Sequence, residues 1–247
     1  MHILGIQFRQ SVYAQEQEQT CIGRCIADAA TVTYLSALDD TVSWAEPEAL
    51  VAGYDAVILG GSGDFDFDGG RALDDPARTV SDTFLQRLTP LLDHIMAHDV
   101  PTLGICYGHQ LIGAWAGVPI TCDTAQKKTG TYSVRCTEAG RADQLFGTLP
   151  QEIQAQYGHK DALGTVPAGS TLLMEGGPQC CVPALRYTPH VYTVQFHPEL
   201  AAADMIERLK NSPGYLPDGV QAEDLIRDDP AANALISSFI TEVVARR

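Results

Sequence analysis

Residues 101–116 read PTLGICYGHQLIGAWA, an apolar run, then a cysteine between two near glycines, then a second apolar run. The first five residues predict a short buried strand, and the last eight predict a helix. Gly104 and Gly108 would permit a sharp turn that exposes the side chain of Cys106 between them. A strand, a tight turn and a helix in this order are the building unit of a parallel α/β sheet.

The rest of the chain repeats this alternation of short β-branched runs with longer helical patterns. It predicts an α/β fold built from parallel β-α-β units, followed by a β-rich second half. The expected strands are residues 2–8, 31–37, 56–59, 102–105, 131–136, 153–157, 171–174, 184–187 and 191–196. The expected helices are residues 16–29, 79–97, 108–116, 201–210 and 231–245.

The length of 247 residues fits a single domain. Many residues that break helices lie between Asn211 and Pro230, namely Pro213-Gly214, Pro217 and Asp218-Gly219. We interpret this segment as a surface excursion within that domain, at the start of a C-terminal helical extension from about residue 211.

Composition and charge narrow the possible partners. The net charge is −15 and the pI about 4.7, which disfavours binding to nucleic acid. No apolar run approaches the ~18 residues of a membrane span. The N-terminal residues also lack the pattern of a signal peptide, so we expect a cytoplasmic protein that binds no membrane. None of the seven cysteines stands in a C-x-x-C pair, and we expect neither a metal site nor a cofactor.

Cys106 is a candidate nucleophile. It would stand at the N-terminus of a helix, where the helix dipole and unpaired N–H groups favour a thiolate. The alternative is a buried structural cysteine whose neighbouring glycines serve only the turn.

A candidate base follows another expected strand, in the stretch VQFHPE that ends at Glu199. A nucleophilic thiol needs a base to take its proton, and the base needs a carboxylate to fix its tautomer. His197 and Glu199 are suitable residue types for these roles. Taken alone, His-Pro-Glu is also typical of a capped turn.

A glycine-rich turn, GGSGD at residues 60–64, follows the strand expected at residues 56–59. Glycine lets the backbone come close to a reacting carbonyl, so an N–H group here could bind a tetrahedral oxyanion together with the N–H of Tyr107. Ligands of open α/β sheets bind beyond the carboxyl ends of the strands. The three motifs could therefore meet in space.

The glycine-rich turn, G-x-C-x-G-x-Q and Q-F-H-P-E occur together and in this order, over about residues 55–200. With them the chain resembles the class I (triad) glutamine amidotransferases, and in particular a free-standing member similar to the glutaminase domain of GMP synthetase. The resemblance implies a flavodoxin-like fold, with an open and mostly parallel sheet flanked by helices.

The resemblance also implies residue roles. Cys106 would be the nucleophile, His197 the general base and then acid, and Glu199 its orienting partner. Gly61 and Tyr107 would supply the oxyanion N–H groups. The implied cycle is attack on the glutamine amide, release of ammonia, and hydrolysis of a γ-glutamyl thioester to glutamate.

The implied substrate contacts come from three places. Gln110 would hold the glutamine substrate, and Gly63 in the glycine-rich turn would lie against it. A Gly-His-Lys-Asp stretch resembles the family segment S-H-G-D, whose backbone helps hold the substrate, so His159, Lys160 and Asp161 join the predicted site. Lys160 replaces the usual glycine, and it could pair with a carboxylate on a substrate larger than glutamine or simply point to solvent.

An acidic loop, DFDFDG at residues 64–69, has the opening pattern of a calcium loop, with Asp75 at the twelfth position. A strand rather than a helix precedes it, Arg71 takes the eighth position, and Asp replaces the bidentate Glu. We interpret it as an acidic loop near the mouth of the site.

Two enzymatic functions fit these observations. The first is a glutaminase that supplies ammonia to a separate synthetase subunit, since the chain contains no P-loop and little sequence beyond the glutaminase core. The second is a free-standing γ-glutamyl hydrolase or peptidase, which uses the same thioester on Cys106 without a partner. A non-enzymatic binding module is disfavoured by the intact Cys, His and Glu set.

Overall fold

The computed structural model describes residues 1–177, 180–211, 215–216 and 219–247. Within these ranges, nine strands form a large sheet and two short strands form a small one. The large sheet contains β1 (His2–Gln7), β2 (Thr31–Ser36), β3 (Ala56–Leu59), β4 (Thr102–Ile105), β6 (Lys128–Cys136), β7 (Glu152–His159), β9 (Thr171–Glu175), β10 (Ala184–Thr188) and β11 (Val191–Val194). The small sheet pairs β5 (Ile120–Thr121) with β8 (Ala162–Leu163).

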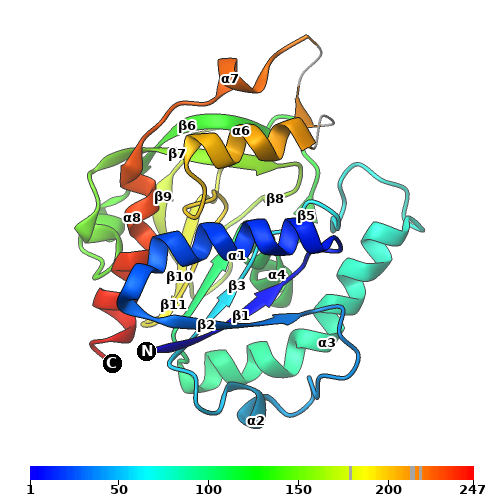
Figure 1. Ribbon diagram of the computed structural model, residues 1–247, viewed down its shortest axis with the longest axis vertical. Coiled ribbons are helices and arrows are strands. Elements are labelled where there is room, and N and C mark those ends of the chain that lie inside the picture. The colour runs from blue at the N-terminus through cyan, green and yellow to red at the C-terminus, as the bar shows by residue number, and fades with distance from the viewer. Residues whose placement is uncertain (178–179, 212–214, 217–218) are drawn as a thin grey trace.

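The helices are spread along the whole chain (Figure 1). They are α1 (Val12–Ile26), α2 (Pro47–Val51), α3 (Pro76–His98), α4 (Tyr107–Trp115), α5 (Glu138–Arg141), α6 (Ala202–Asn211), α7 (Ala222–Leu225) and α8 (Pro230–Ser238). A π-helical stretch, Phe239–Val244, continues α8. No helix in the described ranges is both long and apolar enough to cross a membrane.

The strand order of the large sheet is β2-β1-β3-β4-β11-β10-β9-β6-β7. The first five strands in this order pair in parallel. The others are joined by antiparallel pairings. The parallel part has the 2-1-3-4-5 order of flavodoxin-like sheets. The structure therefore confirms the predicted α/β fold with its β-rich second half.

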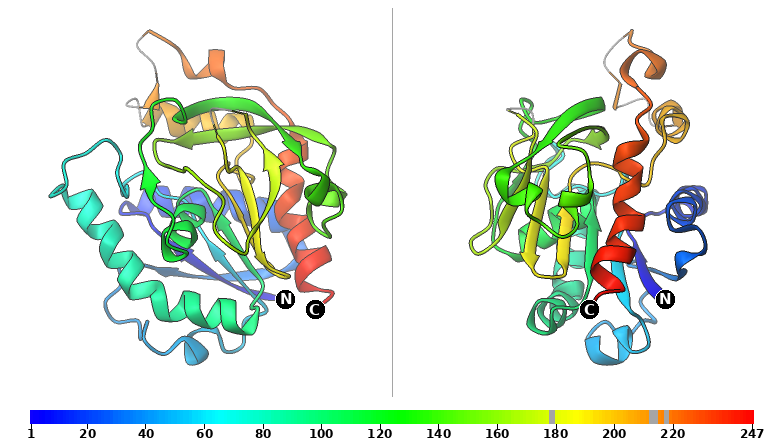
Figure 2. Two further views of the ribbon diagram at one scale, coloured as in Figure 1. Left: turned by 180° about the vertical axis from the view of Figure 1, so that it is seen from behind. Right: turned by 90° about the vertical axis from the view of Figure 1, so that its left-hand side faces the viewer.

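Helices cover both faces of the parallel strands. Successive strand residues point to opposite sides, so each strand contributes side chains to both layers. Ile58 belongs to an apolar cluster that includes residues of α1 and α8, whereas its neighbour Val57 belongs to a cluster with residues of α3 and α4. Figure 2 shows α1 and α3 on opposite sides of the sheet. Both strand faces are thus buried, as expected for a parallel sheet.

Several helix boundaries differ from the sequence-based expectation. Helix α1 begins at Val12 rather than at residue 16, because the Ser11 side chain caps it by accepting a hydrogen bond from the Ala14 N–H. Helix α3 begins at Pro76 rather than at residue 79, where Asp75 is the cap. Helices α2, α5 and α7 were not expected, since four or five residues are too short to show a helical period.

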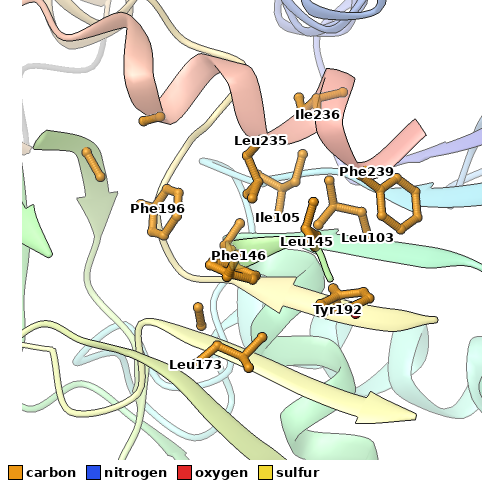
Figure 3. Close-up of a cluster of buried hydrophobic side chains, with 14 of the residues drawn as sticks. Leu103, Ile105, Leu145, Phe146, Leu173, Tyr192, Phe196, Leu235, Ile236 and Phe239 are labelled. Carbon is orange, nitrogen blue, oxygen red and sulfur yellow. The ribbon is translucent and has the colours of Figure 1, made fainter. Parts of the chain in front are cut away.

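The C-terminal segment is part of the main core. Leu235, Ile236 and Phe239 are fully buried, and they pack with side chains from the centre of the sheet (Figure 3). The extension expected from about residue 211 therefore includes elements that complete the core beside α1. Of the helix breakers expected between residues 211 and 230, Pro213, Gly214, Pro217 and Asp218 lie outside the described residues.

Candidate active site

Cys106 lies at the tight turn between β4 and α4. Its backbone angles are φ 50° and ψ −93°, in a region that residues other than glycine rarely adopt. The turn also brings backbones very close together, since a Cβ added at Gly108 would lie 2.4 Å from the Leu59 carbonyl oxygen. Strained backbone of this kind costs about 1–3 kcal/mol and clusters at functional sites. The two glycines thus allow a turn that holds Cys106 out from the strand.

His197 and Glu199 form a buried pair just beyond the carboxyl end of β11. His197 Nδ1 lies 2.7 Å from Glu199 Oε1, and the side chains are 4% and 1% exposed. A carboxylate can only accept, so Nδ1 carries the proton and Nε2 is left for the sulfur. This arrangement fits the roles of base and orienting partner that the resemblance implies, and those roles stay predictions.

The charges of this pair favour an imidazolium beside the sulfur. Burial lowers the pKa of His197, but the Glu199 carboxylate and the Cys106 sulfur, which also hydrogen-bonds the ring, raise it to about 9. Burial raises the pKa of Glu199, but the His197 and Arg208 charges lower it to about 2. At neutral pH the two side chains are therefore an ion pair, with a proton available at His197.

The three sequence motifs meet at one point. A Cβ added at Gly61 would lie 3.1 Å from His197 Cε1 and 3.8 Å from Cys106 Cβ. Gln195, which is fully buried, donates from Nε2 to Cys106 Sγ at 3.6 Å. Segments more than 130 positions apart in the sequence thus form one compact site.

In this conformation the Gly61 N–H, which is a predicted oxyanion donor, is hydrogen-bonded within the protein, and its oxyanion role stays a prediction. The Gly61 N–H donates to Glu18 Oε1 at 3.1 Å, so it is already engaged by a carboxylate. Glu18 is 1% exposed and also accepts from Gln7 and Arg9. Tyr107, by contrast, is the first residue of α4, and its N–H has no carbonyl within the helix to donate to.

The predicted substrate residues Gln110, His159 and Asp161 come together. Gln110 Nε2 donates to the Asp161 carbonyl oxygen at 2.7 Å, and His159 Nδ1 lies 3.0 Å from the same oxygen. The Asp161 carboxylate accepts from the N–H groups of Asp68 and Gly69, at 2.8 and 2.6 Å. Its side chain therefore holds the acidic loop, and contact of these residues with substrate stays a prediction.

Lys160, for which the two alternatives were a substrate carboxylate and solvent, is partly buried and forms an ion pair. Its side chain is 18% exposed, and Nζ lies 3.3 Å from Asp66 Oδ2. Nζ is also 4.9 Å from the centre of the Tyr215 ring. The ion pair with Asp66 holds the Lys160 side chain in this conformation, and its contact with a substrate carboxylate stays a prediction.

The acidic loop is held by basic side chains. Asp66 also pairs with Arg71 Nε at 2.7 Å, and Asp68 lies 3.4 Å from Arg78 Nη1. In the part of the chain that the structure describes, no group of three or more His, Cys, Asp or Glu side chains is placed to hold a metal ion.

A cavity of about 220 Å³ opens beside His197. Gly63, one of the predicted substrate residues, is part of its wall, together with Arg9 and Arg208. Arg9, Glu18, Gln195 and Arg208 were not among the predicted site residues. A signal existed for Arg9, which follows the first strand at the same sheet edge, and for Gln195, which stands inside the VQFHPE stretch.

The structure thus places a cysteine on a strained strand–helix turn beside a His–Glu pair, at the carboxyl edge of a parallel sheet. Comparison with known families is more specific. The glutamine amidotransferase class-I family matches residues 40–211, which is more than half of the chain. The chain belongs to this family.

Among curated proteins, the chain is similar to glutamine-hydrolyzing GMP synthase subunits from two archaea. It is 32% identical to the Methanocaldococcus jannaschii protein over 130 residues, which cover 51% of this chain and 66% of that one. It is 33% identical to the Thermococcus kodakarensis protein over 112 residues, which cover 45% and 57%. These matches thus span less than two thirds of the relatives' own length.

Solved structures share the fold. A glutamine amidotransferase from Thermotoga maritima superposes with a TM-score of 0.70 at 19% identity, covering 99% of this chain and 98% of that one. One from Methylobacillus flagellatus gives a TM-score of 0.69 at 18% identity, covering 99% and 92%.

Proposed function

We propose that this chain hydrolyses the side-chain amide of glutamine through a γ-glutamyl thioester on Cys106. The ammonia would be supplied to acceptor chemistry on a separate synthetase subunit. The observation that carries the proposal is the meeting of Cys106 with the buried His197–Glu199 pair, in a chain of the class-I glutamine amidotransferase family. The similarity to the archaeal GMP synthase subunits supports the part that concerns ammonia and a partner.

In the proposed cycle the Cys106 sulfur attacks the amide carbon, and the carbonyl oxygen becomes an oxyanion beside the Tyr107 N–H. The carbon–nitrogen bond then breaks as His197 gives its proton to the leaving nitrogen, which departs as ammonia. Water, deprotonated by His197, attacks the thioester carbon, and the carbon–sulfur bond breaks to release glutamate. Glu199 holds the ring and its charge throughout.

In this conformation the Gly61 N–H donates to Glu18 and would not be free to bind the oxyanion of this cycle. Removal of one oxyanion donor costs about 10²–10³-fold in rate. In this conformation the Glu18 carboxylate withholds such a donor. We therefore expect the isolated chain to release ammonia from glutamine slowly.

Affinity labelling tests the proposal directly. Diazo-oxo-norleucine is a glutamine analogue whose carbon becomes covalently attached to the attacking sulfur, and peptide mapping by mass spectrometry identifies the modified residue. We expect modification of Cys106, none in Cys106→Ala, and normal labelling in the control Cys122→Ala, which removes a half-buried thiol elsewhere. Labelling of a different cysteine, or of none, would contradict the proposal.

The γ-glutamyl hydrolase alternative uses the same triad and differs in the group that leaves. The cavity beside His197 supports it as a second activity, since a leaving group larger than ammonia needs space next to the residue that would protonate it.

A further inference from the structure

The side chain of Gln195 lies between Cys106 and the segment that is predicted to hold substrate. Gln195 follows β11 directly, and its backbone N–H donates to the Pro183 carbonyl oxygen at 2.9 Å. The residue is fully buried. One end of its side-chain amide contacts Gln110, and the other end contacts the sulfur of Cys106.

A backbone carbonyl fixes the orientation of the Gln110 amide. Gln110 Nε2 lies 2.7 Å from the Asp161 carbonyl oxygen, which can only accept a hydrogen bond. The nitrogen of the Gln110 amide, and not its oxygen, must therefore lie at this position. This nitrogen carries a second proton, and Gln195 Oε1 lies 3.4 Å from it.

The contact with Gln110 determines which end of the Gln195 amide faces the sulfur. Because Oε1 accepts from Gln110, Nε2 is the atom that lies 3.6 Å from Cys106 Sγ and donates to it. The reversed amide would bring two donors together at Gln110 and would turn oxygen lone pairs toward the sulfur. The arrangement thus presents an N–H donor to the nucleophile.

A donor at this place favours the charged form of the sulfur. Hydrogen bonds to an ionised group are stronger than those between neutral groups, so the N–H stabilises a thiolate more than a thiol. Cys106 is 2% exposed and Gln195 is fully buried, so little water competes for the contact. In the proposed cycle the sulfur is charged before it attacks the amide, and again when the carbon–sulfur bond of the thioester breaks.

We propose that Gln195 is a catalytic residue of this site, whose amide N–H stabilises the Cys106 thiolate both as nucleophile and as leaving group. The inference rests on the proposed function and adds a fourth side chain to Cys106, His197 and Glu199. The amide keeps its protons throughout, so the bonds that form and break are those of the proposed cycle.

Other ionisable groups also act on the charge of the sulfur. His197 hydrogen-bonds it and is in turn paired with Glu199. The further groups that interact with this charge are Arg9, Cys180 and Tyr215. Because all of them stay in the protein when only Gln195 is changed, a comparison of variants isolates the effect of the amide.

The ultraviolet absorbance of the thiolate gives a test that needs no substrate. Each protein is titrated with pH beside its Cys106→Ala counterpart, and the difference isolates the ionisation of this sulfur. Gln195→Met keeps the length of the side chain and removes the donor. We expect the pH midpoint of thiolate formation to rise by about one unit, a tenfold change in the thiol–thiolate equilibrium, as for the loss of a hydrogen bond to a charged group.

Gln195→Glu separates the loss of the donor from a change of packing. It keeps the shape of the side chain and the acceptor for Gln110 Nε2, but a carboxylate cannot donate to the sulfur. We expect its midpoint to rise at least as far as that of Gln195→Met, and glutamine hydrolysis at neutral pH to slow in both variants. If both variants have the circular dichroism of the wild type and an unchanged midpoint, the proposal is overturned.

Gln156→Met is the matched control. Gln156 is 3% exposed, but its amide accepts from Thr131 Oγ1 at 2.8 Å and donates to the Arg227 carbonyl oxygen at 2.9 Å. Its midpoint should be that of the wild type. A shift as large as that of Gln195→Met would mean that loss of any buried amide alters the site, and it would contradict a specific role of Gln195.

The two proposals fail in distinguishable ways. If diazo-oxo-norleucine labels Cys106 but the Gln195 variants keep the wild-type midpoint, the glutaminase chemistry stands and the role of Gln195 is wrong. If the midpoint rises as expected but no cysteine is labelled, Gln195 stabilises the thiolate and the proposed function is wrong.

Discussion

The Glu199 carboxylate stabilises the charged form of His197, so a substitution of Glu199 tests the role of that charge. Glu199→Gln keeps the size of the side chain but removes the carboxylate that raises the pKa of His197 to about 9. We expect that pKa to fall toward its ordinary value near 6.5 and the rate of glutamine hydrolysis to fall at least about 100-fold. Imidazole NMR titration and an ammonia-release assay measure the two effects.

The surface pair of His190 and Asp99 provides the control for that experiment. His190 Nδ1 lies 2.7 Å from Asp99 Oδ2, the same separation as in the buried pair. Asp99→Asn should leave both the titration of His197 and the hydrolysis rate unchanged. A Glu199→Gln protein that retains the wild-type rate would show that Glu199 has no part in the chemistry.

Local sequence predicted those site residues whose positions follow from the sheet. Cys106 and His197 each follow a strand, and neighbouring parallel strands end at the same edge, so their approach could be expected. The engagement of Gly61 could not be expected. Its partner Glu18 stands in the run Glu-Gln-Glu-Gln at residues 16–19, which is typical of a solvent-facing helix surface. Which of these side chains turns inward depends on how α1 packs.

At the scale of elements, the strands were predicted more closely than the helices. Buried strands are continuous apolar runs bounded by turn residues, and β3 and β4 have the expected limits. Helix ends depend on individual capping side chains such as Ser11 and Asp75. Such a side chain caps a helix only where the chain geometry brings its oxygen to a backbone N–H, and the local sequence does not report this geometry.

The turn between β4 and α4 gives a prediction at this scale. Gly108→Ala would place a methyl group 2.4 Å from the Leu59 carbonyl oxygen, which belongs to the neighbouring strand and cannot move away cheaply. We expect destabilisation by at least about 3 kcal/mol, by analogy with overpacking in a close-packed core. Urea unfolding followed by circular dichroism measures it.

Gly23 is the matched position for comparison. It lies within α1, and an added Cβ there would meet nothing within 4 Å. Gly23→Ala should stabilise the protein by about 0.5–1 kcal/mol, because alanine favours the helix. If both alanine variants shifted stability in the same direction, the crowding argument for Gly108 would be wrong.

At the scale of the whole molecule, the C-terminal elements share one core with the central strand β4. Side chains of α8 and of the stretch Phe239–Val244 pack with Leu103 and Ile105 of β4, more than 120 positions earlier (Figure 3). Local patterns report which face of an element is apolar, but not what covers it. For this reason local sequence predicts the C-terminal helices as an extension rather than as core.

This shared core predicts a single unfolding transition. Phe239→Ala removes a fully buried ring and should cost about 3–5 kcal/mol, with the same denaturant dependence as the wild type. Leu73→Ala is the control, because Leu73 is 84% exposed and should change stability by less than about 0.5 kcal/mol. A separate early transition for the C-terminal residues would instead identify them as an independent unit.

Two histidines away from the His–Glu pair make the whole molecule sensitive to acid. His109 and His159 are 0% and 2% exposed, and burial lowers the pKa of each to about 3. In the unfolded chain the same groups take up protons near pH 6.5, so their contribution to stability is complete above that pH and is lost as the pH falls toward 3. Each should cost about 2 kcal/mol at pH 5. His197 acts differently, because its raised pKa leaves its contribution intact below pH 6.5 and removes it as the pH rises through about 9.

The variant His109→Gln separates the contribution of one of these histidines. It cannot take up a proton in the unfolded state, so its free energy of unfolding should fall less steeply between pH 6.5 and pH 5 than that of the wild type. His98→Gln removes an exposed histidine and should keep the wild-type slope. Urea unfolding at several pH values gives the slopes. Equal slopes for His109→Gln and the wild type would mean that His109 takes up its proton in the folded protein as well, and that acid sensitivity has another source.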